Sequence, residues 1–482
     1  MNAHVLLRLS IVLAALIIAF PASATTIQIV NADGTNEGFN DPTPATPVGG
    51  NTGTTIGEQR LIVFQAVADR WERYVHSDVD AVIHVVAQFN PMGSGVLGSC
   101  GSISVYRDFP NAPLSGHWFS VALANAIAGY DMAPAANEIS AQFNSAYANW
   151  YYGLDGPPGG AATALFAVVM HELAHGLGFQ TFADEDTGQL FNNYPDHYTY
   201  YTYDPTLRLT WDQMTNAERI SSATKYWNLT WNGPRVTGAT PSHLTQDDAA
   251  LRVDSPPAIA DSHTATCPAL LTSGAWGGAL TTTGLSGTAE LVTDGTALPN
   301  EGCNALVGFT AGNIALVDRG TCEFGLKCLN AQTAGAIGCV VVNQNTAAGG
   351  NNPDGLLNMG AGTYGASVTI PAVMIAMTPG DEIKSELPGA TVTMGLFRKS
   401  GANPHGWALL YSPEPTQPGS SISHFDDTMV PNALMEYAIN ADTWAGPDLT
   451  VFQFEDVWWP RGELFADGFE TGDWSNWFEV VP

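Results

Sequence analysis

The chain has 482 residues, and its 46 acidic against 16 basic side chains give a formal net charge of −30. Phosphate contacts need clustered Lys and Arg, so this balance argues against a nucleic-acid partner. A content of 45% hydrophobic and 13% charged residues is typical of a folded protein, while 50 Gly and 30 Pro argue against long helical bundles and coiled coils.

Residues 1–24 have the pattern of a secretory signal peptide. Arg8 precedes an apolar run over residues 11–20, and the Ala-Ser-Ala of residues 22–24 fits a small-residue cleavage site. The run is short for a membrane span, and an uncleaved anchor is the alternative. No later stretch is long and apolar enough to cross a bilayer, so we expect a secreted protein, extracellular or, in a bacterium, periplasmic or at the cell surface.

The mature chain is expected to begin with a loop, a helix and a strand. Residues 25–57, rich in Thr, Pro, Gly and Asn, are predicted to be a loop. Apolar residues recur at helical spacing over residues 58–76, and alternation over residues 79–89 predicts a half-buried strand. Three acidic residues of the loop could hold calcium, although their spacing matches no defined calcium loop and a solvated surface is the alternative: Asp33, Glu37 and Asp41.

A strand over Ile139–Phe143 and a buried helix over Ala162–Phe179 follow. The helix carries His171, Glu172 and His175. Residues four apart lie on one face of a helix, so both imidazoles can bind one zinc ion with the carboxylate beside its open position. Zinc would lower the pKa of its bound water to near 7, and Glu172 would take the proton as that water attacks a peptide carbonyl. The same carboxyl group would then protonate the leaving amine.

This helix resembles the zinc helix of the metzincin metallopeptidases. Its His171, Glu172 and His175 are followed by Gly178, which allows a sharp turn back towards the metal. The metzincin signature places its third ligand, a histidine, three residues after that glycine. Thr181 stands at this position, and threonine is not a usual zinc ligand.

The run over residues 423–435 resembles the leishmanolysin subgroup of metzincins, which inserts a segment before the third histidine. The resemblance implies that His424 is the third zinc ligand and Met435 the residue of the Met-turn. It also implies that Tyr437 hydrogen-bonds the developing oxyanion, with a packing role as the alternative. Sequence separation alone leaves other third ligands open: Asp184, His197, Glu218 and His405. For Ile139–Asn144 we expect either the edge strand that pairs with an extended substrate or an internal strand.

Residues 269–398 differ in texture from the rest, being rich in Gly, Ala and Val with few charges. Residues 313–324, 340–343 and 370–375 resemble the protease-associated (PA) domain. The same residues predict an α/β unit with no titratable cluster, so we expect no chemistry there. The resemblance implies that the domain shapes substrate access or binds partners, with an inert spacer as the alternative.

Six cysteines in an oxidising compartment could all be paired. Four of them, Cys303, Cys322, Cys328 and Cys339, lie within the PA-like region, and their connectivity cannot be deduced from sequence. A bond between Cys100 and Cys267 is the expectation for the remaining two.

The sequence therefore predicts an α+β protein in which a metzincin-type zincin domain, with a mixed sheet and an active-site helix, is split by an inserted α/β PA domain. The expected function is that of a secreted zinc-dependent endopeptidase acting on proteins or peptides, with zinc, and as a further candidate calcium, bound. The alternatives are a catalytically inactive zincin-fold binding or adhesion protein and a zinc hydrolase for other bonds. The expected divisions are a signal peptide, two catalytic segments flanking the PA domain, and an acidic aromatic tail: 1–24, 25–268, 269–398, 399–460 and 461–482.

Overall fold

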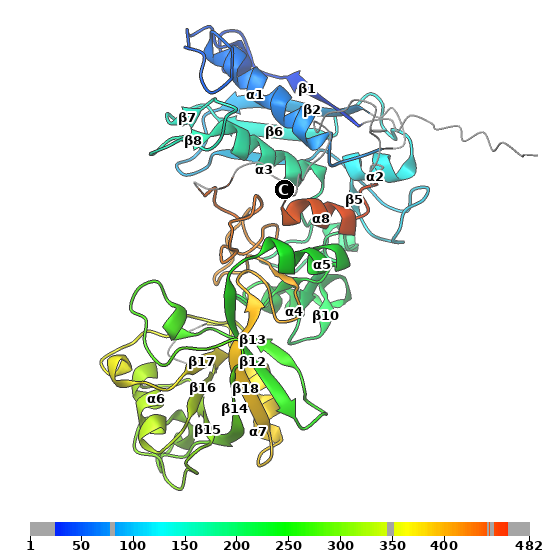
Figure 1. Cartoon of the computed structure of the whole chain (residues 1–482). Helices are drawn as coiled ribbons and strands as arrows, with labels where there is room; N and C mark the ends of the chain where they lie inside the picture. The colour runs from blue at the N-terminus through cyan, green and yellow to red at the C-terminus, as the bar shows by residue number, and fades with distance from the viewer. Residues whose placement is uncertain (1–24, 78–81, 345–350, 441–442, 444–447, 461–482) are drawn as a thin grey trace, which may run out of the picture.

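The structure is a computed structural model (Figure 1), and the residues that it describes are 25–77, 82–344, 351–440, 443 and 448–460. The predicted signal peptide and the predicted acidic tail lie outside these ranges. None of the helices within the described ranges has both the length and the hydropathy of a membrane span.

The described residues form an α+β fold. Its α-helices are α1 (Ile56–Trp71), α2 (Val121–Ala128), α3 (Leu165–Leu177), α4 (Asn216–Ser222), α5 (Pro234–His243), α6 (Phe324–Thr333), α7 (Met377–Ser385) and α8 (Leu449–Asp456). Its longer strands are β1 (Thr26–Asn31), β2 (Val82–Asn90), β3 (Gly98–Ser102), β6 (Ile139–Asn144), β12 (Asp247–Ser255), β14 (Leu285–Leu291), β15 (Ile314–Asp318), β16 (Gly338–Val342), β17 (Ala372–Ile375) and β18 (Thr391–Lys399). Its shorter strands are β4 (Val105–Tyr106), β5 (Phe119–Ser120), β7 (Trp150–Tyr151), β8 (Thr163–Ala164), β9 (Thr202–Asp204), β10 (Leu209–Thr210), β11 (Thr230–Trp231), β13 (Ser262–Thr264) and β19 (Ala408–Leu409).

The N-terminal part of the described chain contains a four-stranded sheet with the order β1-β2-β6-β3, and α1 and α3 pack against this sheet. β1, β2 and β6 are parallel, and β3 is the one antiparallel strand of this sheet. Alternate side chains of β2, from Ile83 to Phe89, are buried against α1, as the predicted pattern requires. α1 begins at a capping box in which Thr55 and Glu58 satisfy each other's backbone N–H groups.

The predicted helices and the strand β2 are present with shifted ends, but two further strands differ from expectation. β1 forms within the predicted loop, where the Ile27 side chain is buried. The strand at Ile139–Asn144, β6, is internal, because β2 and β3 pair with its two sides. The edge-strand alternative for this segment is therefore wrong. The edge strand next to α3 is β3, whose Gly-Ser-Cys-Gly-Ser sequence has no alternating apolar pattern, and β1 forms the other edge.

The inserted domain is built on a seven-stranded sheet with the order β13-β12-β18-β14-β15-β16-β17. Strands β14 to β17 are parallel, and β12, β13 and β18 join them by antiparallel pairing. Both faces are covered, since Val340 and Val342 face one core and Val341 the other. β12 and β13 belong to this sheet although they precede residue 269, where we place the start of the insert from sequence.

Two disulfides, Cys303–Cys322 and Cys328–Cys339, close within the inserted domain. Cys100 and Cys267 are free thiols, so the expected bond between them is wrong. Cys100 lies on β3 beside the first core, whereas Cys267 is buried in the core of the insert. The two thiols therefore belong to different domains.

After the insert, the chain returns to the first core. β19 pairs with β11, which precedes the insert, in a second four-stranded sheet with the order β10-β9-β11-β19. Buried residues between Ala402 and Trp459 join the core that begins at Ile27. In Figure 1 the sheet with α1 and α3 lies at one end of the molecule, the insert at the other, and α4, α5 and α8 between them.

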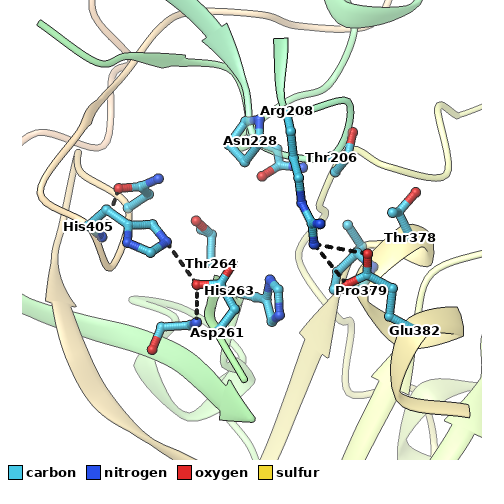
Figure 2. Close-up of a pocket in the computed structure, with 14 residues that line it drawn as sticks. Thr206, Arg208, Asn228, Asp261, His263, Thr264, Thr378, Pro379, Glu382 and His405 are labelled. Carbon is cyan, nitrogen blue, oxygen red and sulfur yellow. Dashed lines mark hydrogen bonds and ion pairs between the residues drawn. The ribbon is translucent and has the colours of Figure 1, made fainter. Parts of the chain in front are cut away.

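Ion pairs join the insert to this middle region around a small polar cavity (Figure 2). Arg208 lies 3.0 Å from Glu382 of α7, and His405 lies 3.1 Å from Asp261. These pairs are partly exposed and connect the two domains at the rim of the cavity.

A buried ion pair lies beside this cavity. The Nζ of Lys225 is 2.9 Å from the Asp204 carboxylate of β9 and 3.6 Å from Asp354 of the insert. Lys225 and Asp204 are almost completely buried. Both domains supply a carboxylate to one buried ammonium group. This charge therefore helps to fix the position of one domain relative to the other.

Candidate metal centre

Helix α3 supports the candidate centre and is buried along its whole length. A helix that is apolar nearly all round is a core helix, so its polar side chains occupy a protected site. The helix ends at Gly178, whose φ of +125° is a conformation that favours glycine. The turn places the carbonyl oxygen of Phe179 2.7 Å from Nδ1 of His175.

The structure brings His171, His175 and His424 together. Their three Nε2 atoms form a nearly equilateral triangle, with separations of 3.1, 3.2 and 3.2 Å. Nitrogens bound to one tetrahedral zinc at ~2.05 Å lie about 3.3 Å apart, so the triangle has nearly the size of a zinc ligand set. The three side chains are at most 8% exposed.

The other ring nitrogens fix the tautomers. Nδ1 of His171 lies 2.7 Å from the carbonyl of Leu434, and Nδ1 of His424 lies 2.8 Å from that of Ser420. A carbonyl only accepts, so each Nδ1 donates a proton to it, and each Nε2 presents a lone pair to the triangle. Three lone pairs cannot hydrogen-bond to one another. An electron-pair acceptor at the centre satisfies all three, and the donor set fits a zinc ion.

Burial also keeps the three rings neutral. It lowers the pKa of His171 to about 4 and that of His175 to about 3, and it lowers the pKa of His424 well below its ordinary value. Metal ions bind neutral imidazole, so the protonation state suits a metal site.

Glu172 lies one residue after His171 and is 8% exposed. It lines a cavity that the three histidines also line. Burial raises its pKa to about 8, and a cation at the triangle would act in the opposite direction by favouring the carboxylate. A Cβ atom on residue 98 would lie 2.9 Å from Cγ of Glu172. Gly98 therefore allows β3 to pass directly against this side chain, a role that sequence analysis missed.

His424 reaches α3 through pairing between two late segments of the chain. The N–H of Phe425 donates to the carbonyl of Met435 at 2.8 Å, and the neighbouring carbonyl of Leu434 is the partner of His171. Met435 is completely buried. The segments containing the predicted third ligand and the predicted Met-turn residue thus lie side by side under the helix.

The competing third ligands lie elsewhere. Glu218 caps α4 at the surface, and Asp184 accepts the backbone N–H groups of an exposed turn. His197 is bonded to the carbonyls of Trp118 and Gly178, and His405 lies at the domain junction.

Thr181, where the metzincin signature has a histidine, donates its hydroxyl to Asp196 at 2.9 Å. This hydrogen bond gives Thr181 a partner outside the triangle. Glu301, Cys303 and Cys322 also lie close enough together to share a metal ion. They offer no free thiolate, because the two cysteines form a disulfide.

The predicted calcium residues are already bonded within the protein. Carboxylates of Asp33, Glu37 and Asp41 each accept at least one backbone N–H. Within the described ranges, the groups close enough to share an ion do not include them. The alternative of a solvated surface loop is compatible with these contacts.

The triangle opens into a cavity of about 860 Å³. β3, α3 and the segments 417–424 and 437–439 line it. Tyr437 is 38% exposed at this cavity and stacks on Tyr411, with ring centroids 4.0 Å apart. A strand edge beside an open cavity can pair with an extended chain, so the arrangement can hold a peptide next to Glu172 and the triangle.

Two family models match the chain. The PA domain matches residues 287–383, and the SPBPB7E8-like family matches residues 126–233, which include α3. Comparison with curated proteins gave no match.

Several solved structures match part of the chain at low similarity. A zinc aminopeptidase from Bacillus subtilis has 16% identity and a TM-score of 0.21, covering 33% of this chain and 35% of that one. For an aminopeptidase from Aneurinibacillus sp. strain AM-1 the values are 17%, 0.20, 33% and 36%. For the psychrophilic subtilisin-like protease Apa1 from the Antarctic psychrotroph Pseudoalteromonas sp. AS-11 they are 19%, 0.23, 31% and 33%. The match thus spans about a third of the length of each of these proteins.

The PA-domain match lies within the inserted domain. It includes residues 313–375, where the resemblance predicts a PA domain. The chain is an α+β protein that contains a PA domain.

Proposed function

We propose that the protein is a secreted zinc-dependent endopeptidase of the metzincin type, similar to leishmanolysin. The observation that carries the proposal is the triangle of three imidazole nitrogens, each with its lone pair turned inward, beside the buried Glu172 in an open cavity. A structural zinc site has four protein ligands, whereas three ligands beside a cavity leave a position for water and substrate.

Zinc bound there would activate water and polarise a peptide carbonyl. Glu172 accepts the proton of the attacking water and delivers it to the leaving amine, because its carboxyl group is held against β3 beside the triangle. β3 aligns the substrate backbone by pairing with it along its free edge. Tyr437 stands at the cavity and is proposed to hydrogen-bond the developing oxyanion.

Other features support parts of this proposal. His424 lies close to Met435, and the insert lies between the second and third proposed ligands in the sequence. The leishmanolysin resemblance implies both features. A PA domain favours protein or peptide substrates. Two disulfides are consistent with an extracellular protein.

The test is zinc content and casein hydrolysis of the purified protein and three variants. We expect Glu172→Gln to keep zinc but to lose about 10²- to 10⁴-fold in kcat/KM, the usual contribution of general acid–base catalysis. His424→Ala should lose both zinc and activity while keeping its circular dichroism spectrum. His405→Ala, which changes a histidine at the domain junction, should keep both and serves as the matched control.

Two outcomes would contradict the proposal. Wild-type protein that binds zinc but cleaves no protein or peptide offered to it would favour an inactive binding or adhesion protein. A His424→Ala variant with full zinc content and full activity would show that the third ligand lies elsewhere.

A further inference from the structure

The cavity at the triangle has an uneven distribution of charge. Among the residues that the structure describes, its lining includes no Lys and no Arg. Apart from Glu172 and the three histidines, Glu185 is the one lining residue with an Asp, Glu, Lys, Arg or His side chain among the described residues. The described walls of the cavity therefore supply no Lys or Arg partner for Glu185, and a bound molecule could supply one.

Glu185 lies at the end of the cavity beyond the C-terminus of α3. It shares that end with Gln180, Thr181 and the segment 417–421. The run of β3 agrees with this placement, because Gly98 faces Glu172 while a Cβ atom on residue 101 would lie 3.4 Å from the Gln180 amide oxygen. The polar end is thus about three residues along β3 from the proposed general base.

The opposite end of the cavity is less polar and lies near the start of α3. Val168 and Ile439 line it, and Ile439 also lines a neighbouring pocket with Ala164, the N-cap residue of the helix, and Ala167 from its first turn. Apart from Glu172, the one acidic side chain among the described lining residues therefore lies at the end beyond the helix.

Glu185 differs from the two acids that flank it because it lines the cavity, whereas Asp184 and Asp186 are not among the lining residues. Asp184 accepts the N–H groups of its own turn, and Asp186 accepts the hydroxyl of Thr416. Glu185 is half-buried, and burial is the largest cause of its raised pKa; hydrogen bonds to the backbone of Glu185 and Gly419 lower the pKa, while Asp186 and Asp184 add to the rise. No Lys or Arg contributes to its pKa shift. Its carboxylate is therefore partly desolvated, and the hydrogen-bond partners that affect its pKa are neutral backbone groups.

We propose that this end of the cavity is a subsite for a Lys or Arg side chain of the substrate, and that Glu185 determines the preference. The inference rests on the proposed peptidase function. An ammonium or guanidinium group would pair with the Glu185 carboxylate, while Gln180 and the segment 417–421 offer neutral acceptors around it. Glu185 contacts the substrate side chain and takes no part in the reaction.

The test uses peptides that share one cleavable sequence and carry Lys, norleucine or Glu in turn at each position flanking the cleaved bond. For wild type we expect the ratio of kcat/KM for Lys over norleucine to reach about 10- to 100-fold at one position, the usual range for a hydrogen bond to a charged group. Glu185→Gln should bring this ratio close to one, and Glu185→Lys should favour the Glu peptide. Asp184→Asn removes the same charge one residue away and should keep the wild-type ratio, because Asp184 does not line the cavity.

The outcomes separate this inference from the proposed function. Cleavage of the norleucine peptide without any preference for Lys or Arg overturns the subsite and leaves the peptidase standing. A preference that survives Glu185→Gln and Glu185→Lys overturns the role of Glu185. A wild-type protein that cleaves none of the peptides overturns both proposals.

Discussion

At the scale of single residues, the three histidines are prepared for a metal before it binds. Hydrogen bonds from each Nδ1 to a carbonyl fix the tautomers, and burial disfavours the imidazolium form. A ligand that is already neutral and oriented costs little to recruit, so proton competition with zinc should begin only at low pH.

This protonation state gives a prediction for zinc release. Protons displace zinc as the pH falls through the pKa that the histidines have in the folded protein. Burial lowers these values from the ordinary 6.5 to about 4 for His171 and about 3 for His175. We expect zinc occupancy, measured by equilibrium dialysis at fixed free zinc, to be constant between pH 7 and about pH 5 and to fall as the pH approaches 4. Half-release near pH 6.5 would contradict this.

At the scale of elements, strand β3 is the part of the centre that depends most on glycine. It passes so close to Glu172 that a Cβ atom at residue 98 would meet the carboxylate at 3.1 Å and Cγ at 2.9 Å. The strand can shift away, or the glutamate can move, but either change separates the substrate edge from the proposed general base.

The Gly98→Ala variant tests this contact. We expect it to fold and bind zinc but to lose about 10²-fold in kcat/KM on peptides, the usual cost of misplacing a reacting group by ~1 Å. Gly101→Ala is the control on the same strand, since its new methyl group would meet only the flexible end of Gln180, at 3.4 Å. Equal kinetics of the two variants would show that the close approach of β3 does not matter.

Sequence patterns predicted the elements whose signals are local. The alternation in β2 and the apolar helix with His171, Glu172 and His175 are visible in short windows, and both elements are present. β3 was missed because its stability comes from pairing with β6 and its small residues serve close packing, so it lacks an apolar pattern.

Long-range pairing carried no local signal. His424 lies 249 residues from His175, and only the family resemblance, not spacing, pointed to it. Glu185 was missed because no sequence pattern shows which acid lines a cavity. Its two flanking acids, Asp184 and Asp186, look equivalent to it in the sequence.

At the scale of the whole molecule, the two domains are held by a buried charge at their junction. Lys225 pairs with Asp204 of β9, outside the insert, and with Asp354 of the insert. Removing one partner of a buried pair leaves the other charge unpaired in a place that water cannot reach.

Lys225→Met should therefore lower the free energy of unfolding by about 3–5 kcal/mol in urea titrations followed by tryptophan fluorescence. The double variant Lys225→Met with Asp204→Asn should recover part of this loss, because the unpaired charge is gone. Lys399→Met breaks the exposed pair with Asp247 and should cost less than about 1 kcal/mol. A loss for Lys225→Met no larger than that of the control would show that the junction does not depend on this pair.

The insertion also sets the order in which the proposed centre can come into existence. A ribosome that has just added His175 must synthesise the whole inserted domain before His424 emerges, 249 residues later. Until then, the nascent chain carries the zinc helix with only two of its three proposed ligands. A chain interrupted anywhere within the insert therefore lacks the third proposed ligand, and the complete proposed centre can form only after synthesis has passed His424.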